Sequence, residues 1–566
     1  MASRTEQSLR EVEMQGINTK WIATVASIWI QCCSGATYTF GIYSSTLKST
    51  QNYDQSTLDT VSVFKDIGAN VGVLSGLLYS FVTFNHRSRL HFLRGPWVVL
   101  ATGAILCFAG YFLMWASVVG LIHRPPVLLM CLFMFTAAHS QTFLNTGNVV
   151  TGVMNFGDYS GTIVGIMKGF LGLGGAALIQ FYDTICKGNP STFLLILALL
   201  PTLVSLLLMC LVRIYGIRSV DEKKHLNAFS AVAMTIAAYL MVIIILENIF
   251  TFPLWARILT FIILLLLLAS PLRIAIKAQR EDTVRSSQTF STERSQLVDY
   301  PETMTSAKIS TEQDPVVYHD LPGEASQVNT VFDDEVLKDE EDMNILQAMS
   351  TLNFWLLFIA MLCGMGSGLA TVNNISQVGE SLSYTTTEIN SLVSLWSIWN
   401  FLGRFGGGYV SDIFLHRMGL ERPLFIAITL ATMSVGHIVV ACGFPGNLYV
   451  GSVIVGVCYG CQWSLMPTIT SEIFGVGHMG TIFNTIAIAS PVGSYICSVR
   501  IIGYIYDKVS TGGSNSCYGT HCFMLSFFIM AFVAFFGCLV GFLLFFRTRR
   551  FYKQVVLRRL WHSSRT

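Results

Sequence analysis

The chain has 566 residues, of which 52% are hydrophobic and only 12% are charged, and its formal net charge at pH 7 is +2. This composition excludes a water-soluble globule of that size, because the polar side chains are too few to coat it. The small net charge gives no reason to expect binding to nucleic acid.

A polar segment, residues 1–20, precedes the first apolar stretch and lacks the features of a cleaved signal, so the first span is expected to stay in the protein. Crossing the hydrocarbon of a lipid bilayer takes about 20 helical residues. No barrel-like alternation is visible, so the predicted fold class is an all-α membrane protein. About fourteen stretches qualify, at 21–44, 58–81, 96–119, 127–154, 161–182, 193–215, 228–249, 254–276, 352–373, 389–410, 424–442, 449–470, 481–504 and 523–546.

These spans group as six, two and six. We expect a six-helix bundle over residues 21–216, two additional helices over 217–276 and a second six-helix bundle over 350–546. Residues 277–349 are expected to form a disordered cytoplasmic linker, because 16 acidic and 4 basic side chains lie between Glu281 and Asp342. This linker could bind a cytoplasmic protein. A basic tail, residues 547–566, ends the chain.

Charge predicts the orientation. Basic side chains gather in the loops on the side of the N-terminus, and this asymmetry is typical of loops that face the cytoplasm. Both termini are therefore expected in the cytoplasm, with the protein in the plasma membrane or in a vacuolar or other endomembrane. The basic loop residues include Arg87, Arg89, Arg94, Arg213, Arg218, Lys223, Lys224, Arg404, Arg417 and Arg422.

Most of the 14 cysteines lie in apolar segments, and none has the spacing of metal ligands, so no metal or cofactor is expected. Cys517 and Cys522 share a polar loop, and Cys186 and Cys442 lie in other loops of the same side. A disulfide could form there if that side is extracytoplasmic.

A repeat links the two bundles. Phe156-Gly157 followed by Gly161-Thr162-Ile163 returns as Phe474-Gly475 followed by Gly480-Thr481-Ile482, in each bundle between the fourth and fifth spans. This repetition indicates two related membrane halves.

The stretch NFLGRFGGGYVSDIFLHRMGLERP, residues 400–423, places glycines before Asp412 at a helix end. Glycines allow helices to approach closely, and the acid can accept hydrogen bonds from a neighbouring helix N-terminus. The stretch resembles the cytoplasmic loop signature of the major facilitator superfamily. That resemblance implies two six-helix bundles, and a gating network of Arg404, Asp412 and Glu472 that closes the cytoplasmic end.

Three first-half segments resemble the nodulin-like domain of plant facilitator-type proteins, which include the nuclear-fusion-defective-four-like group. The resemblance covers about residues 15–270 and implies a plant multipass transporter with two helices between its halves, without naming a substrate. The segments are WIATVASIWIQCCSGATYTFGIYSSTLKS, VSVFKDIGANVGVLSGLL and NFGDYSGTIVGIMKGFLGLGGAALIQFYD.

A charged side chain at membrane depth costs about 3 kcal/mol unless it is paired or faces water. Lys168 lies within the fifth span, and Lys65 and Asp66 are adjacent on the second. We interpret Lys168 as a positive site for an anionic substrate, with Asp66 as its counter-ion or as a proton-coupling acid. The alternative is a structural salt bridge. Neighbouring helical residues point about 100° apart, so Lys65 and Asp66 are not expected to face the cavity together.

Arg500, in the outer third of the thirteenth span, is a further substrate-binding candidate, although its side chain can also extend outward. Distantly similar oxalate–formate antiporters use cations from both second-half helices at the cavity. The tenth span is expected to have no mid-membrane Arg or Lys, and this difference argues against a dicarboxylate substrate.

Several polar side chains fall on the helices that line the cavity in the facilitator fold. Hydrogen bonding between helices is the alternative role for each of them. The substrate-binding candidates are Gln31, Tyr38, His139, Gln141, Asn145, Asn148, Gln462 and Trp463.

No sequence pattern of an enzyme active site or of a channel filter is present, so neither activity is expected. The sequence predicts a monomeric secondary active transporter that moves a small polar, anionic solute by alternating access around a midplane site. Proton coupling is a hypothesis that rests on Asp66 and Lys168. The alternative function is a transport-inactive membrane sensor or scaffold that signals through the acidic linker.

Overall fold

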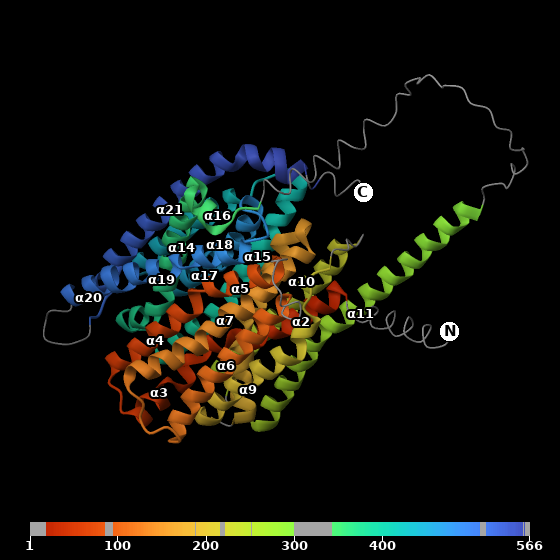
Figure 1. The fold of residues 1–566 in the computed structure, drawn as a ribbon. Helices are drawn as coiled ribbons and strands as arrows, with labels where there is room; N and C mark the ends of the chain where they lie inside the picture. The colour runs from red at the N-terminus through yellow and green to blue at the C-terminus, as the bar shows by residue number, and fades with distance from the viewer. Residues whose placement is uncertain are drawn as a thin grey trace, which may run out of the picture.

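The computed structural model describes residues 19–84, 94–186, 188–215, 221–250, 252–298, 342–509, 517–558 and 560, which form a bundle of helices (Figure 1). The helices of the first half are α2 (Lys20–Cys33), η1 (Ser34–Thr39), α3 (Phe40–Gln51), α4 (Gln55–Asn70), α5 (Val73–Phe84), α6 (Pro96–Val119), α7 (Val127–Asn155), η3 (Gly157–Tyr159), α8 (Ser160–Phe181), η4 (Tyr182–Cys186), α9 (Pro190–Leu208) and η5 (Met209–Leu211). Two helices follow, α10 (Glu222–Ile249) and α11 (Leu254–Val298). The helices of the second half are α13 (Ile345–Ser350), α14 (Leu352–Ser381), α15 (Thr386–Met418), α16 (Pro423–Cys442), α17 (Asn447–Ile473), α18 (Met479–Ala487), α19 (Ala489–Ser494), η6 (Tyr495–Gly503), α20 (Tyr504–Val509), η7 (Thr520–Cys522), α21 (Met524–Phe551) and η8 (Tyr552–Val556).

Within the described residues, twelve helices are long and apolar enough to cross a membrane. The expected integral, multi-pass membrane protein is therefore confirmed. Two of the fourteen expected spans are not among the twelve, namely the α2–η1–α3 segment and α15. Both nevertheless run through the bundle (Figure 1). Their polar content has a physical cause, because both supply side chains to the central cavity described below.

We call the side of the bundle at which α2 begins and α21 ends the terminal side, and the other the opposite side (Figure 1). The two halves touch along α8 with α15 and along α5 with α18. The repeat found in the sequence lies at the start of α8 and α18, so its two copies occupy equivalent places.

Local signals at the ends of α15 position the future site. Thr385 and Glu388 form a capping box at its start, and Gly419, with φ of 64°, ends it in a left-handed conformation. Because α16 then begins at Pro423 directly after a short turn, Arg422 lies beside the last turns of α15.

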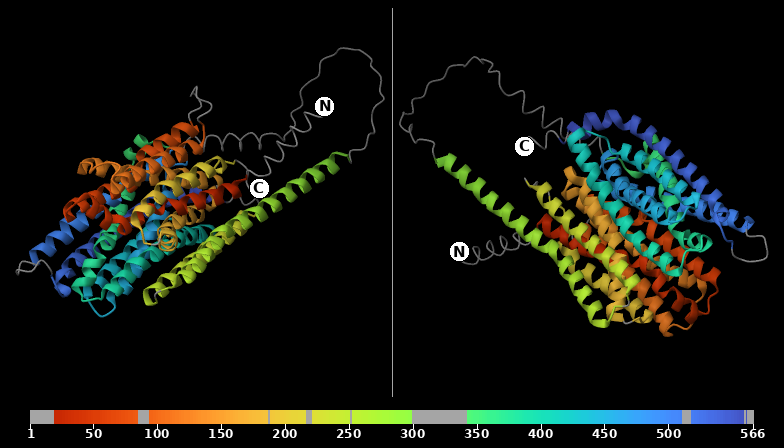
Figure 2. Two further views of the ribbon diagram at one scale, coloured as in Figure 1. Left: turned by 90° about the horizontal axis from the view of Figure 1, so that it is seen from below. Right: turned by 180° about the vertical axis from the view of Figure 1, so that it is seen from behind.

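The two inserted helices lie against one flank of the bundle. α10 contacts α8 of the first half and α15 of the second, and α11 contacts α2. Figure 2 shows α11 projecting beyond the bundle on the terminal side. The helix continues to Val298, past the boundary that was expected at residue 276, and residues 299–341 of the expected linker lie outside the described residues.

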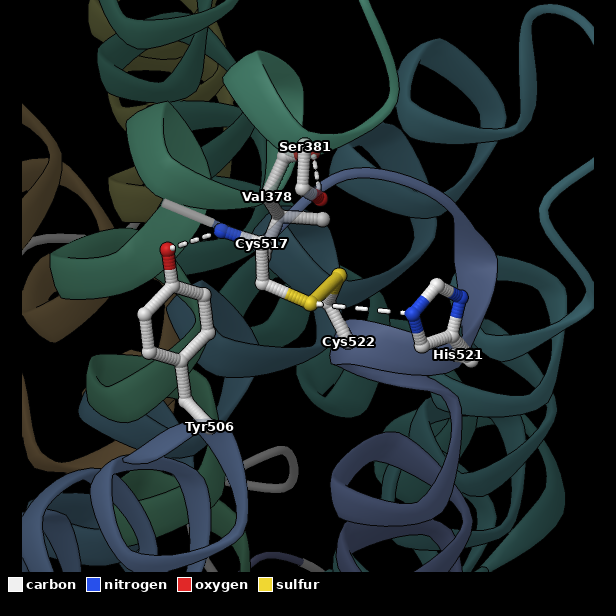
Figure 3. Close-up of a disulfide and its surroundings, with 6 residues drawn as sticks. All are labelled: Val378, Ser381, Tyr506, Cys517, His521 and Cys522. Atoms are coloured by element: carbon white, nitrogen blue, oxygen red, sulfur yellow. Dashed lines mark hydrogen bonds between the residues drawn. A yellow bond between two sulfur atoms is a disulfide. The ribbon is translucent and has the colours of Figure 1, made fainter. Parts of the chain in front are cut away.

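A loop on the opposite side contains a disulfide between Cys517 and Cys522 (Figure 3). The Gly519 amide donates to the Ser381 carbonyl at 2.8 Å, and the Cys517 amide donates to the Tyr506 hydroxyl at 3.1 Å. The loop is therefore fixed to the ends of α14 and α20. Of the pairings left open by the sequence, this is the one formed, since the thiols of Cys186 and Cys442 are free.

Candidate functional site

A cavity of about 350 Å³ lies between the two halves. Its walls come from η1, α3, α4, α7, α8, α14, α15, α17 and α18, and the lining residues of α14 and α15 lie mainly in the parts of these helices nearer the opposite side. Three cationic side chains line it, Lys65, Lys168 and Arg404, against one carboxylate, Asp66. The described cavity wall thus has a formal excess of two positive charges.

Lys168 lies in the middle of α8 and is only 2% exposed. Its ammonium nitrogen lies 5.2 Å from the ring centroid of Trp463 and 5.4 Å from that of Phe483, both in the second half. Contacts with aromatic rings contribute about 0.5–2 kcal/mol, less than the cost of a charge at membrane depth. No carboxylate of the described residues forms an ion pair with Lys168.

Arg404 on α15 reaches the same cavity and is held by neutral groups. Its Nε donates to Asn400 Oδ1 at 2.9 Å, its Nη1 to the Lys168 carbonyl at 3.2 Å and its Nη2 to the Tyr38 hydroxyl at 3.0 Å. Its guanidinium carbon also lies 5.6 Å from the centroid of the Trp463 ring that Lys168 contacts. In the described part of the chain, Arg404 has no ion-paired carboxylate either.

The expectation that the tenth span carries no mid-membrane cation is therefore wrong. The span was expected at 389–410, which put Arg404 near its end, whereas α15 has 33 residues and runs from Thr386 to Met418. The longer helix brings Arg404 close to its middle. The argument against a dicarboxylate, which depended on that absence, is withdrawn.

Lys65 and Asp66 both line the cavity and form an ion pair, with 3.2 Å between Nζ and Oδ1. The expectation that they cannot face the cavity together is wrong, because the long lysine side chain bends over the Phe40 ring, 5.1 Å from its centroid. Asp66 therefore pairs with its neighbour. The suggested pairing of Asp66 with Lys168 is not formed in this structure.

The eight polar candidates divide evenly. Those that line the cavity are Tyr38, Gln141, Asn145 and Trp463. The other four are buried between helices outside the cavity lining; they are Gln31, His139, Asn148 and Gln462. Two of these four illustrate their packing roles, because Gln31 donates to Asn145 at 3.3 Å and Gln462 donates to the Met433 sulfur at 3.7 Å.

Arg500 does not belong to the cavity. It lies in η6, a π-helical segment, with an exposed side chain and no place in the cavity lining. Its position outside the cavity and its exposure agree with the alternative of a side chain that extends outward.

A second cluster closes the terminal side and is built around Arg422, which is 1% exposed. Its Nη2 donates to Asp412 Oδ1 at 2.6 Å, its Nε to Glu472 Oε1 at 2.6 Å and its Nη1 to the Ser411 hydroxyl at 2.7 Å. Burial disfavours the charged guanidinium, but Glu472 and Asp412 together raise the pKa of Arg422 above its ordinary value. We call Asp412, Arg422 and Glu472 the terminal-side network.

The terminal-side network also joins the two halves. The residue before α8, Tyr159, does not cap the helix with its side chain. Instead, Asp412 of the second half accepts from the Gly161 amide at 3.2 Å and from the Thr162 amide at 2.5 Å. A carboxylate at a helix N-terminus is stabilised both by these donors and by the helix dipole. Asp412 thus caps a helix of the other half.

The expected network contained Arg404 in place of Arg422, and that assignment is corrected. Arg404 lies eight residues before Asp412 on the same helix, which separates them by ~12 Å along the axis. Arg422 was noted in the sequence as a basic loop residue only. The signal that identifies it is its position directly before Pro423, at the start of the next helix and ten residues after Asp412.

Sequence reasoning also missed three cavity amides, Asn70, Asn400 and Asn484. Asn400 is four residues before Arg404, a spacing that places both on one helix face. Asn484 donates to Thr146 of the first half at 2.8 Å and therefore bonds across the halves. Only the fold brings Asn484 to this place.

Two family descriptions match this chain in series. Residues 20–276 match the Nodulin-like family, and residues 339–554 match the NFD4 C-terminal domain. The chain thus combines a nodulin-like domain with an NFD4-type C-terminal domain. The expected resemblance to that plant group is confirmed.

Relatives of this nodulin-like protein agree with the assignment. Protein NUCLEAR FUSION DEFECTIVE 4 of Arabidopsis thaliana is 24% identical over 552 residues, which cover 95% of this chain and 90% of the relative. The probable transporter MCH1 of Yarrowia lipolytica is 25% identical over 188 residues, 31% of this chain and 38% of the relative.

The fold is that of the major facilitator superfamily. The proton:xylose symporter XylE, bound to 6-bromo-6-deoxy-D-glucose, superposes with a TM-score of 0.50 at 11% identity and covers 94% of this chain and 95% of its own. The expected fold class is thus confirmed. This fold, together with the transporter relatives, supports a secondary transporter acting on a small molecule in a lipid bilayer, as opposed to an enzyme.

Proposed function

We propose that this nodulin-like protein moves a small anionic solute across its membrane by alternating access and binds that solute between Lys168 and Arg404. The single observation that carries the proposal is that both buried cations line the cavity while neither has an ion-paired carboxylate among the described residues. An anion that entered the cavity would supply the missing charge.

Three features of the cavity favour a solute with polar and apolar parts. The Arg404 guanidinium is fixed by three neutral acceptors, so it is already oriented before a ligand arrives. The rings of Trp463 and Phe483 offer apolar surface beside the ammonium of Lys168. Gln141 and Asn145 add neutral hydrogen-bonding groups. An organic anion suits this combination better than a bare halide does.

Alternating access requires that one side be closed while the other is open. The terminal-side network is buried and joins the halves through Asp412, whereas the cavity extends toward the opposite side. We assign this structure to the state that is closed on the terminal side, in which the terminal-side network acts as the gate. Opening would break the bonds between Asp412 and the start of α8.

We further propose that the terminal side is cytoplasmic. Basic residues described at the terminal-side ends of helices, among them Arg94, Arg213, Lys224 and Arg417, agree with cytoplasmic loops there. The Cys517–Cys522 disulfide lies on the opposite side, and disulfides persist mainly in oxidising, extracytoplasmic compartments.

Thermal stabilisation of the purified protein tests the anion site. The protein is heated with each of a panel of organic anions, and with neutral amides and amines of matched size. One or more anions should raise the unfolding temperature, while the matched neutral and cationic compounds should leave it unchanged. Lys168→Met and Arg404→Gln should each weaken the response by roughly tenfold to a hundredfold in ligand concentration, since hydrogen bonds to charged groups contribute ~1.5–3 kcal/mol.

Arg500→Gln is the matched control for that measurement, because it removes an exposed cation outside the cavity. It should leave the anion response unchanged. Equal stabilisation by neutral and anionic compounds, or an equal loss in Arg500→Gln, would contradict the proposed site. No flux of any stabilising anion in liposomes would instead favour the alternative of a transport-inactive sensor or scaffold.

A further inference from the structure

Tyr552 begins η8, which continues α21 at the terminal-side end of the last membrane span, and it is fully buried. Its hydroxyl donates to Glu472 Oε2 at 2.7 Å, while the other oxygen of Glu472 accepts from Arg422. The two carboxylate oxygens therefore have different partners. Tyr552 fixes the rotation of the carboxylate that in turn fixes Arg422.

These contacts form a chain of hydrogen bonds that leads from Tyr552 to the contact between the halves. Tyr552 bonds to Glu472, Glu472 to Arg422 and Arg422 to Asp412, all within the second half. The series crosses to the first half at Asp412, which accepts from the amides of Gly161 and Thr162, and more weakly at Arg422, whose Nη2 also donates to the Ser160 hydroxyl at 3.4 Å. The series holds Asp412 in place as an acceptor before the halves meet.

The segment that carries Tyr552 is itself packed against the same region. Val556, at the end of η8, is 1% exposed. A methyl group added at Gly419 would lie 3.3 Å from Leu557 Cδ1, so the chain after η8 covers the turn between α15 and α16. Arg422 ends that turn. Residues 552–557 thus cover the gate from the terminal side.

We propose that Tyr552 is a positioning residue of the terminal-side gate, acting through Glu472, and that η8 makes the terminal-side end of the last membrane span part of that gate. This inference rests on the proposed alternating access. While the gate is closed, Glu472 is only 5% exposed and an unbonded oxygen would be costly. When the gate opens, water can reach Glu472 and replace the tyrosine hydroxyl. The hydroxyl therefore stabilises the closed state more than the open one.

Tyr552→Phe tests this, because it removes the hydroxyl and keeps the buried ring. Spin labels at Gly157→Cys in the first half and Met418→Cys in the second report the separation of the halves on the terminal side. Both positions are exposed, and a side chain at 157 meets no neighbour within 4 Å. The exposed native thiols of Cys210 and Cys442 are replaced by serine beforehand. In Tyr552→Phe the ratio of open to closed molecules should rise roughly tenfold.

Tyr79→Phe is the matched control. Tyr79 is also fully buried, and its hydroxyl lies 2.9 Å from that of Thr151 within the first half. It should lower the unfolding temperature to a similar degree without changing the ratio. A merely structural role for Tyr552 would make the two variants alike, which would overturn the proposal.

A double-mutant cycle with Glu472→Gln identifies the route. If Tyr552 acts through Glu472, then adding Tyr552→Phe to Glu472→Gln changes the open fraction much less than it does in the native background. Full additivity would contradict the route. If the wild type gives two label distances while Tyr552→Phe leaves their ratio unchanged, only the role of Tyr552 fails. A single, fixed distance in every variant and with every anion would remove alternating access as well.

Discussion

Two buried arginines invite comparison, Arg404 in the middle of α15 and Arg422 at the end of the turn that leads into α16. Arg404 is 2% exposed and Arg422 is 1% exposed. Arg422 contacts two carboxylates and is neutralised by its own chain. Arg404 contacts an amide, a carbonyl and a phenol, which fix its direction without cancelling its charge. The same residue type at the same burial thus completes a structural cluster in one place and leaves an anion site incomplete in the other.

The comparison predicts opposite effects of the same substitution. Arg422→Met leaves Asp412 and Glu472 buried without a cation, and breaking a buried ion pair in this way costs about 3–5 kcal/mol. Arg404→Met removes a charge that has no ion-paired carboxylate in the described cavity wall. Thermal unfolding without ligand should therefore fall strongly for Arg422→Met and stay level or rise for Arg404→Met.

The rise in unfolding temperature caused by an anion should depend on the two arginines in the opposite way. It should be lost in Arg404→Met. If the Arg422→Met protein survives purification, it should keep the response. A loss of ligand-free stability in Arg404→Met as large as in Arg422→Met would show that the supposed difference between the two sites is false.

The sequence predicts much of this contrast and misses part of it. The helical membrane fold, the two halves and the inserted pair follow from apolar length and from the repeated turn. Lys168 follows from the cost of a buried charge. Asp412 and Glu472 come from a resemblance, which supplied the acids of the gate and the wrong cation. Assigning Arg404 to the cavity and Arg422 to the gate requires the true length of α15, and helix ends are the least certain feature of a sequence.

The cavity was also harder to predict than the gate, for a physical reason. A polar residue on a cavity-lining helix can face the cavity or a neighbouring helix, and the sequence does not distinguish the two. His139 stacks on Phe135 and lies 3.3 Å from the Gly68 carbonyl, while Gln141, two residues later, lines the cavity. Their difference depends on which way α7 is rotated against α4.

Adding a methyl group at Gly161 should affect the terminal-side gate and leave the anion site intact, with a smaller effect than the arginine substitutions. A methyl group added at Gly161 would lie 2.6 Å from the Gly408 carbonyl and 2.7 Å from Asp412 Oδ1, where the two halves meet. Gly161→Ala should therefore destabilise the closed gate by about 1–3 kcal/mol, the usual cost of overpacking. The spin-label pair should report more open molecules, while anion binding at Lys168 should be retained.

Gly406→Ala provides the control, since a methyl group there meets nothing within 4 Å although it belongs to the same glycine-rich stretch of α15. The open fraction should not change in that variant. Equal shifts in Gly161→Ala and Gly406→Ala would mean that helix propensity, and not the contact between α8 and α15, sets the equilibrium.

Replacing Asp66 should change the free energy of unfolding least, and should affect proton coupling specifically. Its ion pair with Lys65 is partly solvated, with side chains 31% and 17% exposed, so breaking it should cost at most about 1 kcal/mol of stability. Asp66 is, however, the one carboxylate among the described residues that line the cavity. If transport is coupled to protons, this group is the candidate carrier, because Asn in its place can neither bind nor release a proton.

Asp66→Asn should therefore abolish accumulation driven by a pH gradient in liposomes while leaving anion exchange at constant pH intact. Lys65→Met is the matched partner, since it breaks the same ion pair and keeps the carboxylate. It should retain pH-driven accumulation. Loss of accumulation in both variants would assign the effect to the ion pair itself, and unchanged pH dependence in Asp66→Asn would remove proton coupling through this residue. Either result would leave Lys168 and Arg404 as the anion site, because neither of them depends on Asp66 for its contacts.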